Sequence, residues 1–325
     1  MNTNITTIDN YSFITLTNDK GFSVTLCDLG ASIYSIIFNK KEMTFVPEDY
    51  SVFFKGNIYY GKTIGRISNR VKGNKVTIDG KDYLLENNEG ENTLHGGLYG
   101  LSTKKFDYQI KENEEETTIT FTYLMKDLED GLPGNTLIKI TYTISENKDE
   151  LNIDFSAKTD SKTILSLTNH AYFNLGEKDL SPLSLRINAK EYLEVNPANL
   201  LAIQKRPCLA CLNFQTFKKI LRDIDDGYLV NSRTKGYDHY FYFEKVDSAI
   251  SQLSLKSDSI QMDAITDYPG VQIYSDNYKD AKGRNTNKET RRAIAIEPSA
   301  SHLDLHYLES DQEYHHFIKY IFKAL

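Results

Sequence analysis

The chain has 325 residues and a formal net charge of −7, with 26% charged and 40% hydrophobic residues, a composition that is ordinary for a soluble globular protein. The negative charge argues against nucleic acid and an anionic membrane surface as partners, because both attract a basic patch. A chain of this length can bury a substantial core, in two domains or in one large β domain. No linker or internal repeat interrupts it, so we expect one domain over residues 1–325.

Strands are predicted first at residues 76–85, where Asp79-Gly80 separates two short alternating runs. Asp-Gly indicates a tight type I′ turn, because both central residues of that turn take positive φ. A β-rich run of threonine and aromatic residues follows at 117–125. Alternating apolar and polar residues then recur at 138–144 and 151–157, on either side of a polar turn, and predict a hairpin.

Helical periodicity is scarce. Residues 217–224 place apolar side chains on one face and predict a helix of about two turns. The remaining pattern of many short strands favours an all-β fold, a β-sandwich or barrel. Residues 279–292 are charged and nearly free of large apolar side chains, which predicts a long exposed loop that could act as a lid near a site.

Three cysteines, Cys27, Cys208 and Cys211, are an odd and low count that fits free thiols in a reducing compartment. Cys208 and Cys211 form a CxxC pair, but a second ligand pair for zinc is not evident and the surroundings do not predict a thioredoxin-like unit. We interpret them as two unrelated thiols in a loop.

The N-terminal segment predicts where the protein resides. Residues 1–20 are polar, without the basic segment and apolar stretch of a signal peptide. No apolar run approaches the roughly 20 residues that span a bilayer. We therefore expect a cytoplasmic protein.

Two histidines lie in unusual contexts. His95 precedes Gly96 and Gly97, which allow a sharp turn or a close approach of the backbone to a ligand. His170 lies in a segment, residues 168–175, that mixes side-chain amides with aromatic rings, and these suit the hydroxyls and the apolar face of a sugar. Taken alone, each histidine is more often structural than catalytic.

Several further polar residues are candidates for a site. Glu297 ends the apolar run 293–296, where burial would raise the pKa of its carboxyl group and make it a better base. Asp238 is either a site carboxylate or an ordinary turn residue. Asn69 and Arg70 either bind hydroxyl groups or form an exposed pair.

Together these segments resemble one family, the galactose mutarotases or aldose 1-epimerases. Each motif alone is weak, whereas the ordered set, at the family's spacing, is specific and extends from near residue 29 to the C-terminus. The matching segments are Gly65-Arg66 to Asn69-Arg70, Asn92 to Gly97, Asp130 to Asn135, Thr168 to Leu175, Gly236 to His239, Pro269 to Tyr274 and Glu297-Pro298.

The resemblance implies a large single-domain antiparallel β-sandwich, the galactose mutarotase-like supersandwich, that interconverts the anomers of a free hexose. It implies Glu297 as the general base and His170 as the general acid, and no metal or organic cofactor. We expect His170 to be protonated, with Asp238 favouring its charged form. The expected partner is a small-molecule hexose, for a monomer or a weak homodimer. The residues implied to line the sugar site are Asn69, Arg70, His95, Tyr172, Asp238 and Gln272.

The chain departs from the family pattern after Glu297. Many members continue with a glutamine- or histidine-containing segment, and this chain has Pro298-Ser299-Ala300-Ser301-His302 there. This segment and residues 279–292 could border the cleft and change the sugar preference. His302, Asp304 and His306 alternate with apolar residues, which we interpret as a strand with one polar side in preference to a metal-binding face.

Three other functions stay open. One is a hexose-6-phosphate 1-epimerase of the same fold, which would need an additional cationic phosphate site. Another is a non-catalytic sugar-binding protein, which would not need a matched acid and base. The last is a mononuclear metalloenzyme with the plausible ligands His95, His170, Asp238 and Glu297.

Overall fold

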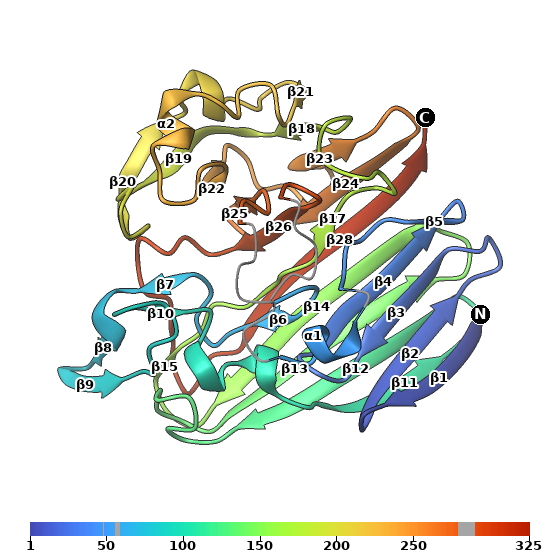
Figure 1. Cartoon of the computed structure of the whole chain (residues 1–325). Coiled ribbons are helices and arrows are strands. Elements are labelled where there is room, and N and C mark those ends of the chain that lie inside the picture. The colour runs from blue at the N-terminus through green and yellow to red at the C-terminus, as the bar shows by residue number, and fades with distance from the viewer. Residues whose placement is uncertain (48, 56–58, 279–289) are drawn as a thin grey trace.

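Strands dominate the computed structural model, which describes residues 1–47, 49–55, 59–278 and 290–325. Within these residues the strands form a five-stranded, a nine-stranded and a six-stranded sheet and four two-stranded ribbons. The pairings within the three large sheets are antiparallel. Figure 1 shows the blue five-stranded sheet beside the green strands of the nine-stranded sheet, with most of the six-stranded sheet in the upper part of the molecule.

The N-terminal sheet is a meander in which each strand pairs with the next along the chain. Sequential antiparallel pairing needs only short connections and is the commonest arrangement of neighbouring strands. The strands are β1 (Asn2–Ile8), β2 (Tyr11–Thr17), β3 (Ser23–Cys27), β4 (Ser32–Phe38) and β5 (Lys41–Glu42).

The nine-stranded sheet forms the other layer of the sandwich. Four of its strands follow one another in sequence, and the C-terminal strand joins them to a group from the second half of the chain. In order across the sheet they are β11 (Asp107–Glu112), β12 (Glu116–Met125), β13 (Thr136–Ser145), β14 (Glu150–Thr159), β28 (Tyr314–Ala324), β24 (Ile260–Thr266), β23 (Leu253–Lys256), β18 (Ser184–Ile187) and β21 (Lys218–Lys219).

The six-stranded sheet carries most of the candidate site. In order its strands are β17 (Tyr172–Phe173), β26 (Ile294–Ser299), β25 (Gly270–Tyr274), β22 (Asp238–Phe243), β19 (Ala189–Val195) and β20 (Ala202–Pro207). The ribbons pair β7 (Arg70–Val71) with β10 (Thr93–Leu94), β8 (Lys75–Ile78) with β9 (Lys81–Leu84), β6 (Thr63–Ile64) with β16 (Thr168–Asn169), and β15 (Thr163–Ile164) with β27 (Tyr307–Leu308). The α-helices among the described residues are the short α1 (Tyr50–Phe53) and α2 (Gly227–Val230).

Side chains from the facing sheets meet in one large apolar core. Ile14 and Leu16 of β2 and Ile138 and Ile140 of β13 are fully buried in the same cluster. Since successive side chains of a strand point to opposite faces, the apolar residues of β13 enter the core while the residues between them face outward. The alternation in the sequence is therefore the direct cause of this packing.

The predicted hairpins are confirmed. Strands β13 and β14 pair from Thr136 to Ile144, across the turn expected there. Strands β8 and β9 are joined by Asp79 and Gly80, which have φ values of 49° and 78°, as a type I′ turn requires. The β-rich run at 117–125 lies in β12.

The predicted helix at 217–224 is wrong. Lys218 and Lys219 form β21, which pairs with β18, and the residues after them form turns. Ile220 and Ile224 are buried in the core all the same. Eight residues are too few to hold an isolated helix, so pairing with a neighbouring strand overrides the local periodicity.

The expected strand at 302–306 is also wrong, because this segment is a loop that precedes β27. Side-chain bonds take the place of a strand ladder: Nε2 of His306 lies 2.7 Å from the carbonyl oxygen of Ser301, and the Leu303 N–H donates to Oγ of Ser301. Most of the loop predicted at 279–292 lies outside the described residues.

All three cysteines are free thiols. Cys208 follows β20, and Cys211 lies in a single 3-10 turn. Burial raises the pKa of both thiols to about 11. At neutral pH both therefore stay protonated and unreactive, as the interpretation of two unrelated thiols requires.

A fully buried ion pair fixes the segment that leads to Asn69 and Arg70. The Arg66 guanidinium is 0% exposed and binds both carboxylate oxygens of Asp130, with Nε 2.9 Å from Oδ2. Its other N–H groups donate to the carbonyl oxygens of Leu132 and Pro133. A buried charge is tolerated only when such bonds satisfy it, so this pair ties residues 65–70 to the loop after β12.

Replacing Arg66 should therefore be strongly destabilising. In Arg66→Met the Asp130 carboxylate stays buried without its partner, and we expect the free energy of unfolding to fall by about 3–5 kcal/mol. Lys75→Met is the control: it breaks a pair with Asp82 in which both side chains are 51% exposed, and exposed pairs contribute at most about 1 kcal/mol. Urea unfolding followed by circular dichroism measures the free energy of unfolding of both variants. Equally small decreases in the two would contradict a stabilising role of the buried pair.

Candidate active site

Strand register brings four of the predicted residues onto one face of the six-stranded sheet. Glu297 of β26 and Gln272 of β25 are directly paired. Tyr172 of β17 and Asp238 of β22 lie in one row with Ala295 and Tyr274, which are two residues along β26 and β25 from Glu297 and Gln272. Residues that are two apart in a strand face the same side, so the four side chains share this surface.

A two-stranded ribbon supplies the next part of the site. Asn69 and His95 stand beside the paired residues Arg70 and Leu94, and both have positive φ values, 65° and 55°. Such a conformation is uncommon for residues other than glycine and concentrates at functional sites. Here it is stabilised locally, because the Asn69 N–H donates to Nδ1 of His95 (3.2 Å) and the His95 N–H donates to the Asn69 carbonyl oxygen (3.0 Å).

These bonds define the tautomer of His95. Because Nδ1 accepts from a backbone N–H, the proton of the neutral ring must be on Nε2. Burial lowers the pKa of His95 well below its usual value, and the charges of His170 and Arg70 lower it further. His95 is therefore a neutral hydrogen-bond donor, suited to an oxygen atom of a ligand.

His170 follows β16 and is held by its backbone. Its N–H donates to the carbonyl oxygen of Lys62, and its own carbonyl oxygen accepts from the N–H of Gly61, both at 2.9 Å. Nε2 of His170 lies 3.4 Å from Oε1 of Glu297, and the two residues are 4% and 2% exposed. The predicted acid and base are thus buried side by side.

Burial shifts the two ionisations in opposite directions. It raises the pKa of Glu297 well above its usual value and lowers the pKa of His170 to about 4. At pH values between the pKa of His170 and the pKa of Glu297, the pair holds one proton. Proton transfer to and from a ligand needs one group with a proton and one without, and the opposite shifts of the two pKa values favour that state.

The expectation that Asp238 keeps His170 charged is wrong for this ligand-free protein. Burial controls the pKa of His170, and the Asp238 carboxylate is engaged elsewhere. Its Oδ2 lies 3.6 Å from Nη1 of Arg70, and its Oδ1 accepts from Nε2 of Gln272 at 2.6 Å. Asp238 acts on Glu297 instead, where its negative charge adds to the rise in pKa.

Glu89, which the sequence did not reveal as important, positions Arg70. Its carboxylate accepts from Nε and Nη2 of Arg70 at 2.7 and 3.0 Å, a two-point pairing that fixes the guanidinium plane. Burial works against the charge of Arg70, but Asp238 and Glu89 together raise its pKa above the usual value. Glu89 lies 19 residues from Arg70 without a distinctive motif, so only the fold shows the contact.

Three buried polar atoms of the predicted site have no hydrogen-bond partner among the described residues: Oδ1 of Asn69, Nδ1 of His170 and Oε1 of Gln272. Buried polar groups are nearly always satisfied in native proteins. Their concentration at one place indicates that a polar ligand or water completes them. A sugar, with hydroxyl groups that both donate and accept, can do so.

Aromatic rings surround the imidazoles. The ring of Tyr172 lies 5.0 Å from that of His170, and the ring of Tyr59 lies 4.9 Å from that of His95 and stacks at 5.7 Å on His170. Tyr172 was predicted, whereas Tyr59 was missed, because a tyrosine pair in an ordinary segment carries no distinctive pattern. The rings exclude water and contribute to the burial that shifts both histidines.

The site also contains three potential metal ligands. Atoms of His95, His170 and Glu297 lie within 4.8 Å of one another. Since Nδ1 of His95 is engaged by Asn69, only its Nε2 could bind a metal ion. Asp238, the fourth ligand that a metalloenzyme would use, is absent from this group among the described residues and is bonded to Arg70 and Gln272.

The comparison with solved structures defines the fold class. The galactose 1-epimerase from Lactobacillus acidophilus NCFM superimposes with a TM-score of 0.90 at 25% identity, covering 99% of both chains. The antiparallel sandwich is therefore of the galactose mutarotase-like type, as the resemblance predicted.

Sequence comparison then identifies the family. The model of the aldose 1-epimerase family matches residues 12–320. The aldose 1-epimerase of Escherichia coli (strain K12) is 29% identical over 281 residues, 82% of this chain and 79% of the relative. The galactose mutarotase of Rattus norvegicus is 29% identical over 239 residues, 70% of this chain and 66% of the relative. The chain belongs to the aldose 1-epimerase family, which is a family of isomerases.

The low pKa of His170 can be measured directly. In protein labelled with ¹⁵N-histidine, we expect the ring nitrogens of His170 to show the neutral form at pH 7 and to gain a proton only as the pH falls toward about 4. The spectrum of His170→Asn identifies the signal. A midpoint at or above about 6.5, the value of an unperturbed histidine, would show that burial does not control this group.

Proposed function

We propose that the protein interconverts the α and β anomers of a free hexose such as galactose. The observation that carries the proposal is the pair of Glu297 and His170, buried 3.4 Å apart with pKa values that burial shifts in opposite directions. Family membership and the activities for which the relatives are named support the same reaction. A protein that only binds sugars would gain nothing from burying such a pair.

The reaction proceeds by ring opening. Glu297, as a carboxylate, takes the proton of the C1 hydroxyl while protonated His170 gives a proton to the ring oxygen, so that the C1–O5 bond breaks and an aldehyde forms. Because burial favours the neutral form of both groups, this step begins with movement of a proton from Glu297 to His170. The aldehyde rotates about C1–C2, and the ring closes on the other face with the two roles reversed. General acid and general base catalysis each contribute about 10²–10⁴-fold.

The surrounding residues hold the sugar. Nε2–H of His95 donates to an oxygen near the reacting carbon, and Arg70 binds hydroxyl groups from a fixed orientation. Asn69 and Gln272 offer their unsatisfied carbonyl oxygens to hydroxyl donors. Asp238 accepts from a further hydroxyl, and Tyr172 packs against the apolar face of the ring. No step requires a cofactor.

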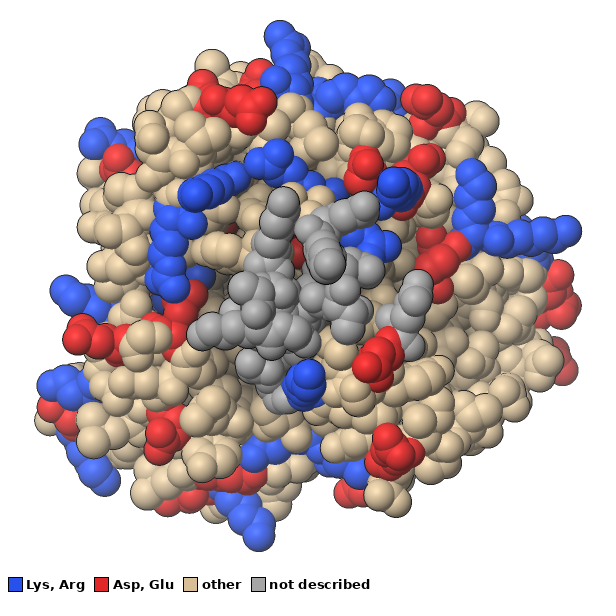
Figure 2. Space-filling view, in the orientation of Figure 1, with Lys and Arg blue, Asp and Glu red and all other residues tan. Residues whose placement is uncertain are grey.

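A phosphorylated hexose is the weaker candidate. Arg70 lines the site, and its charge is already matched by Glu89 and Asp238. A phosphate group placed there would meet two carboxylates. The face shown in Figure 2 carries acidic and basic side chains interspersed, without one prevailing sign that would attract a dianion.

The proposal includes the setting of the enzyme. It acts as a single domain in the cytoplasm, as a monomer or a weak homodimer, on a small-molecule substrate and independently of nucleic acid and membranes. Among the described residues, no helix has the length and apolarity to span a bilayer.

Polarimetry tests the reaction. Freshly dissolved α-D-galactose should reach the same final optical rotation faster with the protein, at low buffer concentration. Glu297→Gln and His170→Asn keep the shape of the side chains and remove the acid–base function, so kcat should fall by about 10²–10⁴-fold in each. If the wild-type protein accelerates neither galactose nor glucose, the proposed function is wrong.

Removal of metal ions by a chelator tests the alternative that the protein is a metalloenzyme. Because the proposed chemistry needs only proton transfer, dialysis against EDTA should leave kcat within about twofold, and elemental analysis should find less than one metal ion per chain. Loss of activity that returns on adding Zn²⁺ or Mn²⁺ would instead show that His95, His170 and Glu297 bind a catalytic metal.

A further inference from the structure

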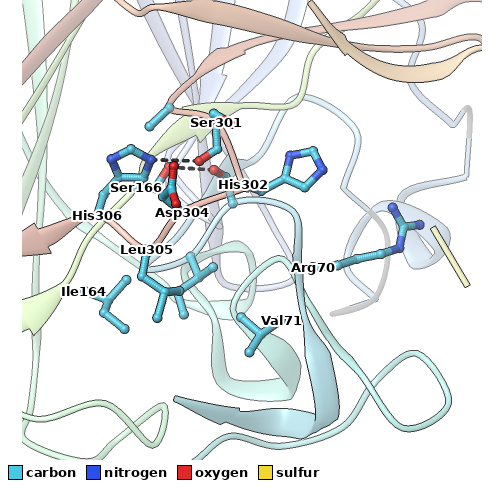
Figure 3. Close-up of a pocket in the computed structure, with 12 residues that line it drawn as sticks. Arg70, Val71, Ile164, Ser166, Ser301, His302, Asp304, Leu305 and His306 are labelled. Atoms are coloured by element: carbon cyan, nitrogen blue, oxygen red, sulfur yellow. Dashed lines mark hydrogen bonds between the residues drawn. The ribbon is translucent and has the colours of Figure 1, made fainter. Parts of the chain in front are cut away.

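A side pocket adjoins the candidate active site, and Arg70 lines it (Figure 3). The pocket is open to solvent and has room for about one group the size of a water molecule, so a hydroxyl group of a sugar bound next to it can enter. The polar part of its lining includes Arg70, Ser166, Ser301, His302, Asp304 and His306.

His302 is held in place in this pocket. Tyr240 and Tyr242 of β22 anchor the loop that carries it: the Tyr240 hydroxyl donates to the carbonyl oxygen of Ser299, and the Tyr242 hydroxyl lies 2.8 Å from Oγ of Ser301. The His302 ring packs edge-on against Tyr240, with ring centres 5.9 Å apart at 89°. A side chain fixed in this way is ready to bind without rearrangement.

The hydrogen-bonding capacity of His302 is incompletely used. Its Nδ1 is buried and has no partner among the described residues. Burial lowers the pKa of His302 to about 3, helped by the charge of Arg70, so the ring is neutral and has one donor and one acceptor. His306, on the other side of the pocket, is different because its Nε2 is 2.7 Å from the Ser301 carbonyl oxygen.

His302 is also close to the residues that would hold the sugar. Its ring points toward the side of the pocket where Arg70 lies (Figure 3), and it contributes to the lowered pKa of His95. Tyr240, on which it packs, is directly paired with Gln272, and Gln272 with Glu297. The imidazole thus stands at the edge of the same surface as the catalytic pair.

Resting on the proposed function, we propose that His302 is a specificity-determining residue that hydrogen-bonds one hydroxyl group of the hexose held at Arg70. A hydroxyl group suits it because it can donate to or accept from a neutral imidazole. We assign His302 no part in proton transfer, because His170 and not His302 lies beside Glu297.

Deoxy sugars test the contact. His302→Phe keeps the ring packed on Tyr240 and removes both nitrogens, whereas His302→Asn keeps polar atoms near the position of Nδ1. KM and kcat are measured by polarimetry for galactose and for its 2-, 3-, 4- and 6-deoxy derivatives. We expect His302→Phe to raise KM about 3- to 10-fold with kcat nearly unchanged, as for loss of one neutral hydrogen bond.

The decisive feature is the pattern across the sugars. The increase in KM caused by His302→Phe should disappear for the one derivative that lacks the contacted hydroxyl. For the other sugars, His302→Asn should restore most of the affinity. His315→Ala serves as control, because that side chain is 61% exposed on β28 and should change nothing. An equal increase for every sugar, or none at all, would mean that His302 binds only water or supports the loop.

Binding measurements separate this proposal from the proposed function. Calorimetric titration of the same sugars into Glu297→Gln, with and without His302→Phe, reports the contact without turnover. If the wild-type enzyme is inactive but the Kd shows the hydroxyl-specific loss, the reaction is wrong and the contact stands. If the enzyme is active and the Kd shows no such loss, the contact is wrong and the reaction stands.

Discussion

Removal of water from Glu297 and His170 is the constraint on which the site depends. In water, a carboxyl group near pKa 4.3 and an imidazole near 6.5 would both be largely ionised over the range between those values. Burial disfavours charge on each, so the carboxyl group keeps a proton more readily and the imidazole loses one. The sheets, the ribbon and the tyrosine rings together produce this dry environment.

Strand pairing and one buried ion pair create that environment. Antiparallel register places Glu297 opposite Gln272, and the β7–β10 ribbon brings Asn69 and His95 to the same surface. The buried Arg66–Asp130 pair holds the chain that enters the ribbon. Residues far apart in sequence are therefore positioned by backbone pairing and one ion pair.

The sequence predicted the β class, the hairpins and the residues that gather at the site, because strand alternation and the ordered motifs are local features. It failed at residues 217–224, where helical periodicity came from core contacts made by turns, and at 302–306, where side-chain bonds replace a strand. It also missed Glu89 and Tyr59, which become partners only in the folded chain. The ionisation of His170 was misjudged, because it depends on burial and not on the type of its neighbours.

The anchoring of the 299–302 loop has an evolutionary consequence. The loop follows β26, which carries Glu297, and it is fixed separately through hydroxyl groups of Tyr240 and Tyr242 on β22. Substitutions within the loop can therefore accumulate with little effect on the proton-transfer geometry. Such a division lets related enzymes diverge in the sugar that they prefer while the underlying chemistry is inherited unchanged.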